Sequence, residues 1–165
     1  KSTIFNRLTK ANIYAADQLF ATLDTTTHKI FIAGCGSVVL SDTVGFIKHL
    51  PHALVEAFGA TLEEAAQADL LLHIVDTAST NRDEQIAQVN KVLGEIGALS
   101  VPQILIHNQI DRVGLPASIE RDEYGRIASI HVSAKTNDGM DLIRLAMAEH
   151  YQLLKQQSTE ESAYV

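Results

Sequence analysis

The stretch that decides the fold of this chain is Val38-Val39-Leu40-Ser41-Asp42-Thr43-Val44-Gly45-Phe46. Its first three residues are apolar and predict a buried strand that ends near Asp42. An aspartate at the carboxyl end of such a strand can hold a water bound to Mg²⁺, and Gly45 lets a backbone N–H approach a terminal phosphate closely. Asp-x-x-Gly is also a common turn, so its meaning depends on the segments before and after it.

Composition limits the classes of protein to which the chain can belong. Its 165 residues are 46% hydrophobic, which predicts one globular domain with a core of its own. No apolar run approaches the roughly 20 residues that a membrane span requires, so we expect none. A single cysteine, Cys35, excludes an internal disulfide and favours a reducing, cytoplasmic compartment. A formal net charge of −7 repels a nucleic-acid backbone, so we expect no DNA binding.

The segment before the deciding stretch begins with Lys1-Ser2 and continues into a helical pattern, with Ile4, Phe5 and Leu8 on one face. A Lys-Ser pair that opens a helix is also how the phosphate-binding loop Gly-x-x-x-x-Gly-Lys-Ser/Thr ends. In such a loop the Lys reaches the outer phosphates and the Ser hydroxyl binds Mg²⁺. Lys1 and Ser2 are therefore candidate nucleotide-binding residues, and Ser2 is also a candidate metal ligand.

A threonine in the loop-like stretch from Asn12 to Thr27 could offer its hydroxyl to Mg²⁺ and its backbone N–H to a γ-phosphate. We select Thr22; the competing candidates are Thr25, Thr26 and Thr27. The apolar runs on either side of the glycines at 34 and 36 predict a β-hairpin with strands over 29–32 and 37–42. Two antiparallel strands thus lead up to the aspartate.

The rest of the chain alternates helical patterns with apolar runs. Helices are predicted over 54–68, 82–96 and 141–154, and strands over 70–76, 102–108 and 127–132. Alternation of this kind is typical of an α/β fold, here with a mostly parallel sheet, one antiparallel hairpin strand and helices on both faces. We expect a single domain over residues 1–155, followed by a polar, frayed tail over 156–165.

Two segments at predicted strand ends can recognise a purine. Asn108 and Asp111 follow one strand, where open α/β sheets bind ligands, and a carboxylate there can accept both N1–H and the 2-amino group of guanine. Ser133-Ala134-Lys135 follows the last strand, and its backbone N–H groups can meet the guanine O6. Adenine has neither the N1–H nor the 2-amino group that Asp111 would accept, so the pattern favours guanine.

Together these pieces resemble a P-loop GTPase, because they occur in the required order at the required strand ends. Two stretches, residues 14–24 and 42–51, are similar to the HflX family of translational GTPases, and the similarity runs from Lys1 to about Tyr151. The resemblance implies GTP or GDP and Mg²⁺ as ligands, hydrolysis of GTP, and the large ribosomal subunit as partner, with ribosome splitting or rescue under stress. It implies catalytic roles for Lys1, Thr22 and Gly45, and Mg²⁺ ligation through Ser2, Thr22 and Asp42. The implied nucleotide-binding residues are Lys1, Ser2, Thr22, Asp42, Gly45, Asn108, Asp111, Ser133, Ala134 and Lys135.

The sequence departs from the family pattern in three places. Gln109 stands where the guanine motif usually has Lys, Thr25 replaces an expected Pro, and the glycines of the phosphate loop, with the strand before them, are absent from the sequence. That strand would lie between those ending at Asp42 and Asp76. We therefore expect the gap to be closed by these neighbours pairing directly or by a segment of another chain. Without the loop, we expect no bound nucleotide or Mg²⁺ and a disordered or displaced stretch around residues 12–27.

Phe46 occupies the position at which Ras-like enzymes place a Gln that orients the attacking water. Phe can neither transfer protons nor form hydrogen bonds, so we expect slow intrinsic hydrolysis that a partner accelerates. The alternative function is a G-domain fold that no longer binds nucleotide and serves as a docking module. Phe46, Gln109 and the absent loop favour that alternative, whereas Asp42 and Asp111 favour the GTPase.

Overall fold

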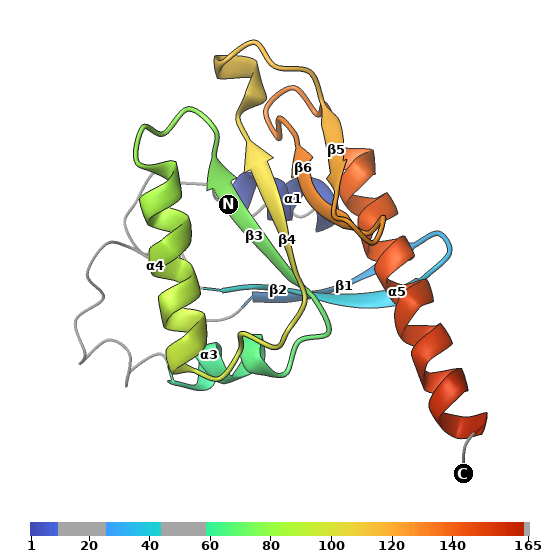
Figure 1. Ribbon diagram of the computed structural model, residues 1–165. Coiled ribbons are helices and arrows are strands. Elements are labelled where there is room, and N and C mark those ends of the chain that lie inside the picture. The colour runs from blue at the N-terminus through green and yellow to red at the C-terminus, as the bar shows by residue number, and fades with distance from the viewer. Residues whose placement is uncertain (10–25, 44–58, 164–165) are drawn as a thin grey trace.

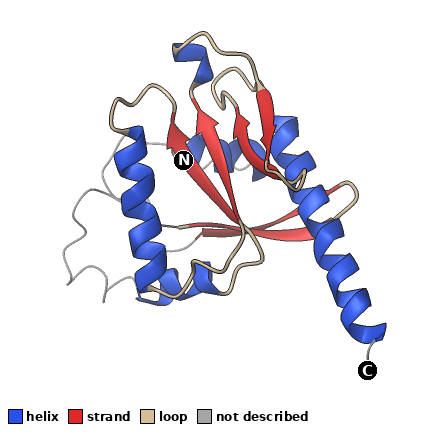
Figure 2. Cartoon of the chain, in the orientation of Figure 1, coloured by secondary structure: helices blue, strands red, loops and turns tan. Residues whose placement is uncertain are grey.

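The computed structural model describes residues 1–9, 26–43 and 59–163 (Figures 1 and 2). Its helices and strands alternate along most of the chain. In chain order they are α1 (Ser2–Thr9), β1 (Thr26–Ile32), β2 (Gly36–Asp42), α3 (Gly59–Ala66), β3 (Leu71–Asp76), α4 (Arg82–Glu95), β4 (Gln103–Asn108), the 3₁₀ turn η1 (Ile110–Arg112), β5 (Ser118–Arg121), β6 (Ile127–His131) and α5 (Met140–Ala163).

The larger sheet has four strands in the order β3-β4-β6-β5. The strands β3, β4 and β6 are parallel, and β5 runs antiparallel to β6. Parallel strands need coverage on both faces. One face of this sheet packs through Ile104, Ile106 and Ile130 against α1 and α5, and the other packs near Leu71 against α4. The predicted fold class is thus confirmed: a mostly parallel sheet with helices on both faces.

The strands β1 and β2 form a separate antiparallel hairpin, which runs at a steep angle to β3 and β4 in Figure 1. A hydrophobic cluster joins the hairpin to the rest of the molecule. Ile32 of β1 belongs to the same buried cluster as Ile4 and Leu8 of α1 and as Met147 of α5. Burial of apolar side chains, rather than a ladder of backbone hydrogen bonds, therefore fixes the position of the hairpin.

We expected the gap between the strands ending at Asp42 and Asp76 to be closed either by direct pairing or by a segment of another chain; direct pairing does not occur among the described residues, and the second alternative stays a prediction. Among the described residues, β2 pairs only with β1, and β3 pairs only with β4. The contacts of Ile32 and its neighbours with α1 and α5 hold the hairpin in a sheet of its own. The predicted displacement of residues 12–27 lies outside the described residues up to position 25, and Thr26 and Thr27 begin β1.

A strand that the sequence analysis did not predict is β5. It forms a hairpin with β6 through a turn in which the Asp122 carboxylate accepts hydrogen bonds from the N–H groups of Tyr124 and Arg126, both at 2.9 Å. Gly125 adopts the left-handed conformation that this turn requires, with φ of 78°. The sequence signal was therefore Asp122-x-x-Gly125 directly before the apolar run of β6.

The final helix is longer than predicted. We expected a frayed tail from residue 156, but α5 continues to Ala163 and extends beyond the sheet in Figure 1. The segment after Leu154 is rich in Lys, Gln and Glu, which are good helix formers, and contains neither Gly nor Pro. The hydroxyls of Ser158 and Thr159 donate to the carbonyls of Leu154 and Lys155, at 3.0 and 2.9 Å. The described residues contain no helix long and apolar enough to cross a membrane.

Candidate functional site

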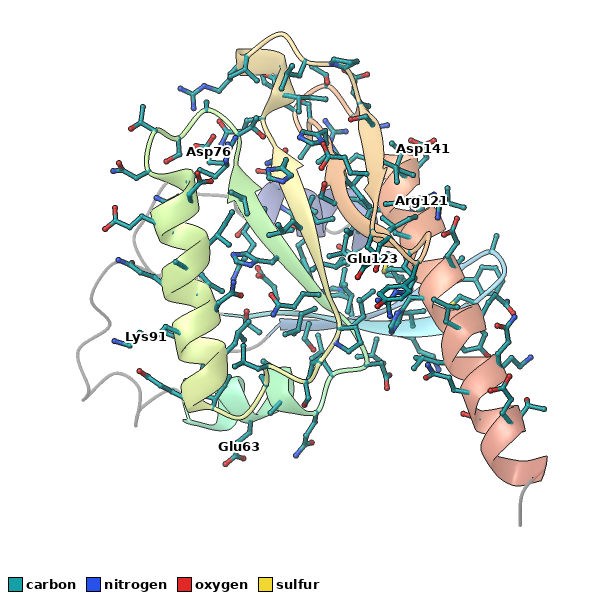
Figure 3. The ribbon with its side chains drawn as sticks, in the orientation of Figure 1. Glu63, Asp76, Lys91, Arg121, Glu123 and Asp141 are labelled. Atoms are coloured by element: carbon teal, nitrogen blue, oxygen red, sulfur yellow. The ribbon has the colours of Figure 1, made fainter. Side chains whose placement is uncertain are left out.

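The carboxyl ends of β3, β4 and β6 meet at one edge of the sheet, which Figure 3 marks with the side chain of Asp76. Asp76 lies beside Asn108 in the parallel register of β3 and β4. Beyond the strands, the Thr77 N–H donates to the Asn108 carbonyl at 3.0 Å, and the Val132 N–H donates to the His107 carbonyl at 2.8 Å. The loops that follow all three strands are therefore anchored to one another.

Four of the predicted base-binding residues are brought together at this edge. The buried Asn108 side chain accepts, through Oδ1, the N–H of Ala134 at 3.0 Å. The hydroxyl of the fully buried Ser133 donates to Oδ1 of Asp111 at 2.6 Å. Because a carboxylate has about four lone-pair sites, Asp111 keeps the capacity to accept further donors from a ligand.

The loop after β6 is closed on itself. The Ser133 N–H donates to the Asp138 carbonyl at 2.9 Å, and the Thr136 N–H donates to the Ser133 hydroxyl at 3.2 Å. The N–H groups of Ser133 and Ala134 are thus already bonded, whereas that of the exposed Lys135 has no partner among the described residues. Contact of this segment's N–H groups with the guanine O6 stays a prediction, and of the three the Lys135 N–H is the donor with no hydrogen bond among the described residues.

At the amino end of α1, Lys1 lies against Asp42 of β2, with Nζ 3.0 Å from the carboxylate Oδ1. Asp42 is buried, with 5% of its side chain exposed, and 31% of the Lys1 side chain is exposed. Burial lowers the pKa of the Lys1 ammonium, and the charge and hydrogen bond of Asp42 oppose that change. The two residues that the sequence analysis assigned to phosphate and Mg²⁺ are therefore adjacent and partly neutralise each other.

Comparison with known proteins agrees with this arrangement. The family described as "50S ribosome-binding GTPase" matches residues 1–109. The chain belongs to this family. The predicted resemblance is also confirmed, since proteins named GTPase HflX from Escherichia coli (strain K12) and Caldanaerobacter subterraneus subsp. tengcongensis are 50% and 46% identical to this chain. These matches cover 90% and 94% of this chain and 35% of each relative, so the chain spans about a third of the length of the curated relatives it matches.

A solved structure with the same fold is that of a GTP-binding protein from the hyperthermophilic archaeon Sulfolobus solfataricus in complex with GDP. The TM-score is 0.68 at 24% sequence identity, and the match covers 93% of this chain and 49% of that one. A variant of the protein named SsGBP gives a TM-score of 0.63 at 26% identity, over 97% of this chain and 53% of that one. Both structures share the fold of this chain.

The departure from the GTPase pattern at Gln109 has a structural counterpart. Gln109 adopts a left-handed backbone conformation, with φ of 69°, and its Oε1 accepts a hydrogen bond from Nη1 of Arg112 at 2.8 Å. The same guanidinium lies 3.8 Å from Oδ2 of Asp76. A cation from η1 thus lies next to the position at which the guanine motif usually supplies Lys.

Two predicted site residues, Thr22 and Gly45, lie outside the described residues, as do Thr25 and Phe46.

The described part of a metal site fits Mg²⁺ by its chemistry, because Asp42 supplies a carboxylate and Ser2 a hydroxyl, and hard cations prefer oxygen. No group of three or more His, Cys, Asp or Glu among the described residues could hold a metal ion. Mg²⁺ at this site would therefore need water and phosphate oxygens to complete its shell.

One residue that contacts the loop after β6 was not predicted from sequence. Arg7 of α1 donates from Nε to the Ala134 carbonyl at 3.0 Å and from Nη2 to the Lys135 carbonyl at 3.2 Å. The available sequence signal was a basic residue in the last turn of the helix that begins at Lys1-Ser2. That signal does not identify the partner, since the two segments are separated by 127 residues.

Proposed function

We propose that this chain is the guanine-nucleotide-binding domain of a ribosome-associated GTPase that hydrolyses GTP to GDP and phosphate. The observation that carries the proposal is the pair of contacts that joins Asn108 to Ala134 and Asp111 to Ser133. These contacts place a carboxylate with spare acceptor capacity beside a loop with an available N–H donor. Guanine presents the complementary edge, with two donors next to an acceptor.

The phosphate end of the site would lie at the start of α1. A bound triphosphate would replace Asp42 as the ion-pair partner of the Lys1 ammonium. The 3.0 Å contact between Lys1 and Asp42 would then break, and the Asp42 carboxylate would become available. Mg²⁺, held through Ser2, Thr22 and a water on Asp42, would neutralise charge on the phosphate oxygens. Release of Lys1 and engagement of the metal would thus occur together.

Hydrolysis would follow in-line attack of water on the γ-phosphorus. Lys1 and the backbone N–H of Gly45 would stabilise charge on the transferred group, because charge spreads over the phosphoryl oxygens in the transition state. With Phe46 in place of a water-orienting Gln, intrinsic turnover would be slow. We propose the large ribosomal subunit as the partner that completes the site and the cytoplasm as the compartment, with ribosome splitting or rescue under stress as the task.

An equilibrium titration of the full-length protein with a fluorescent GDP analogue tests the proposal. Saturable binding that is displaced by GTP but not by ATP is expected. Absence of binding would overturn the proposal and favour the nucleotide-free docking module. Cosedimentation with isolated large ribosomal subunits, in the presence of a non-hydrolysable GTP analogue or of GDP, tests the partner separately, and binding that is independent of the nucleotide would count against the proposed cycle.

A further inference from the structure

The loop that follows β6 is held from two opposite sides. On the side of the sheet, Asn108 binds the Ala134 N–H, and Asp111 binds the Ser133 hydroxyl. On the side of α1, Arg7 binds the carbonyls of Ala134 and Lys135. The contacts on the sheet side involve residues of the recognised guanine motifs, whereas Arg7 belongs to no motif in the sequence.

Peptide planarity turns the Arg7 contacts into a constraint on loop direction. In a trans peptide the C=O and the following N–H point in opposite directions. When Arg7 fixes the Ala134 carbonyl toward α1, it also fixes the Lys135 N–H away from α1. The second contact fixes the next peptide in the same way, and the Thr136 N–H of that peptide donates to the Ser133 hydroxyl. The guanidinium thus determines the direction of two successive peptides.

The direction of the Lys135 N–H matters because it is the donor that the loop leaves available. We propose that Arg7 is a positioning residue for base recognition: it orients this N–H toward the O6 of the bound guanine. The inference rests on the proposed guanine-nucleotide binding and extends it by one residue. Arg7 lies six positions after Lys1, which directly precedes the short helix α1, so this helix connects the proposed phosphate-binding residue to the support of the proposed base-binding loop.

A second arginine provides a matched control. Arg144 of α5 donates from Nη2 to the Leu8 carbonyl at 2.8 Å, so it too anchors α1 through a guanidinium–carbonyl contact. It makes no hydrogen bond to the loop after β6 among the described residues. Arg144→Ala therefore removes an anchor of α1 without altering the peptides at 134–136. A loss of stability would be common to both variants, whereas an effect on O6 recognition would be specific to Arg7.

The experiment measures dissociation constants of GDP, inosine diphosphate and 2-aminopurine riboside diphosphate by competition, in full-length wild-type protein, Arg7→Ala, Arg7→Lys and Arg144→Ala. Inosine keeps O6 but lacks the 2-amino group, whereas 2-aminopurine lacks O6. Arg7→Ala should lower the affinities for GDP and for inosine diphosphate by the same factor of roughly 3- to 10-fold, which corresponds to the loss of one neutral hydrogen bond. The same substitution should change the affinity for 2-aminopurine riboside diphosphate by less than about twofold. Arg7→Lys, which can reach one carbonyl, should fall between wild type and Arg7→Ala.

Each outcome bears on the inference. Equal weakening of all three nucleotides by Arg7→Ala, or the same pattern in Arg144→Ala, would show that Arg7 acts only on the stability of the fold and would overturn the inference. Unchanged affinity for GDP in a folded Arg7→Ala variant would also overturn it. If the wild-type protein binds GDP normally, these results leave the proposed function intact. If it binds none of the three, the proposed function fails, and the inference fails with it.

Discussion

Replacing Asp111 with Asn should change the proposed base preference of the protein from guanine to xanthine. In the structure Oδ1 of Asp111 accepts the Ser133 hydroxyl at 2.6 Å. An Asn that keeps this contact as it stands, with the Ser133 hydroxyl as the donor, uses its own carbonyl oxygen as the acceptor. The amide NH₂ then points toward the base, where it meets the two donors of guanine. Xanthine carries an oxygen in place of the 2-amino group and can accept this NH₂.

The size of the effect follows from the number of groups that lose a partner. Two donors that face each other in the bound complex leave polar groups without a hydrogen-bond partner, which costs about 1–3 kcal/mol of binding free energy. This cost corresponds to a loss of affinity of roughly 5- to 150-fold. We expect Asp111→Asn to weaken GTP by a factor in that range and to strengthen xanthosine triphosphate. The assay is competition of both nucleotides against a fluorescent GDP analogue in the full-length protein.

A matched control is Ser133→Ala, which removes the hydroxyl but keeps the carboxylate. It should lower affinity for nucleotides while preserving the preference for guanine over xanthine, because the acceptor remains. Thermal unfolding of both variants separates a change of base preference from a loss of folded protein. Unchanged GTP affinity in a folded Asp111→Asn variant would show that Asp111 does not read the base.

Three further predictions concern the loop, the sheet and catalysis. Gly139 has φ of 75°, and a Cβ there would lie 2.9 Å from the His131 carbonyl oxygen. Gly139→Ala should therefore lower the free energy of unfolding, measured by urea titration, by about 1–3 kcal/mol. An unchanged midpoint of unfolding would contradict this geometry. Burial, followed by the charge of the adjacent His131, lowers the pKa of His107 below its usual 6.5. The unfolded chain then binds more protons below that pH, so stability should fall on acidification, and the fall should be smaller in His107→Gln; equal slopes for both proteins would refute this. Phe46→Ala should leave intrinsic hydrolysis of GTP by the full-length protein within a few-fold of wild type, whereas a loss of about 10²-fold would assign Phe46 a catalytic role.

Sequence reasoning succeeded where a local pattern and the tertiary structure agree. The strands ending at Asp42, Asp76 and Asn108 were predicted to within a residue or two, because each is an apolar run that ends in a polar residue. The same logic located the edge at which Asn108 and Asp111 approach the loop after β6. Such predictions need only the direction of the strands and the chemistry of the residues that follow them.

The misses have a common physical cause, which is dependence on contacts between distant segments. The four residues of β5 carry only a weak strand pattern of their own, and their pairing with β6 depends on the Asp122 turn. Arg121 of β5 also forms a bidentate ion pair with Glu149 of α5, at 2.9 and 3.0 Å. The contact of Arg7 with Ala134 joins segments 127 residues apart, and no local pattern in either segment indicates it.

The order in which these contacts can form during synthesis follows from the position of α5. This helix binds α1 through Arg144 and Leu8, 136 residues apart, and binds the turn of the first hairpin through Gln152 and Gly34, 118 residues apart. The apolar surface that α5 covers on α1 and on that hairpin therefore stays exposed until α5 has been translated. Contacts so distant in sequence slow folding, and an early segment with unpaired strand edges is prone to aggregation in the meantime. We therefore expect a nascent chain of this domain to be most prone to aggregation before α5 has emerged.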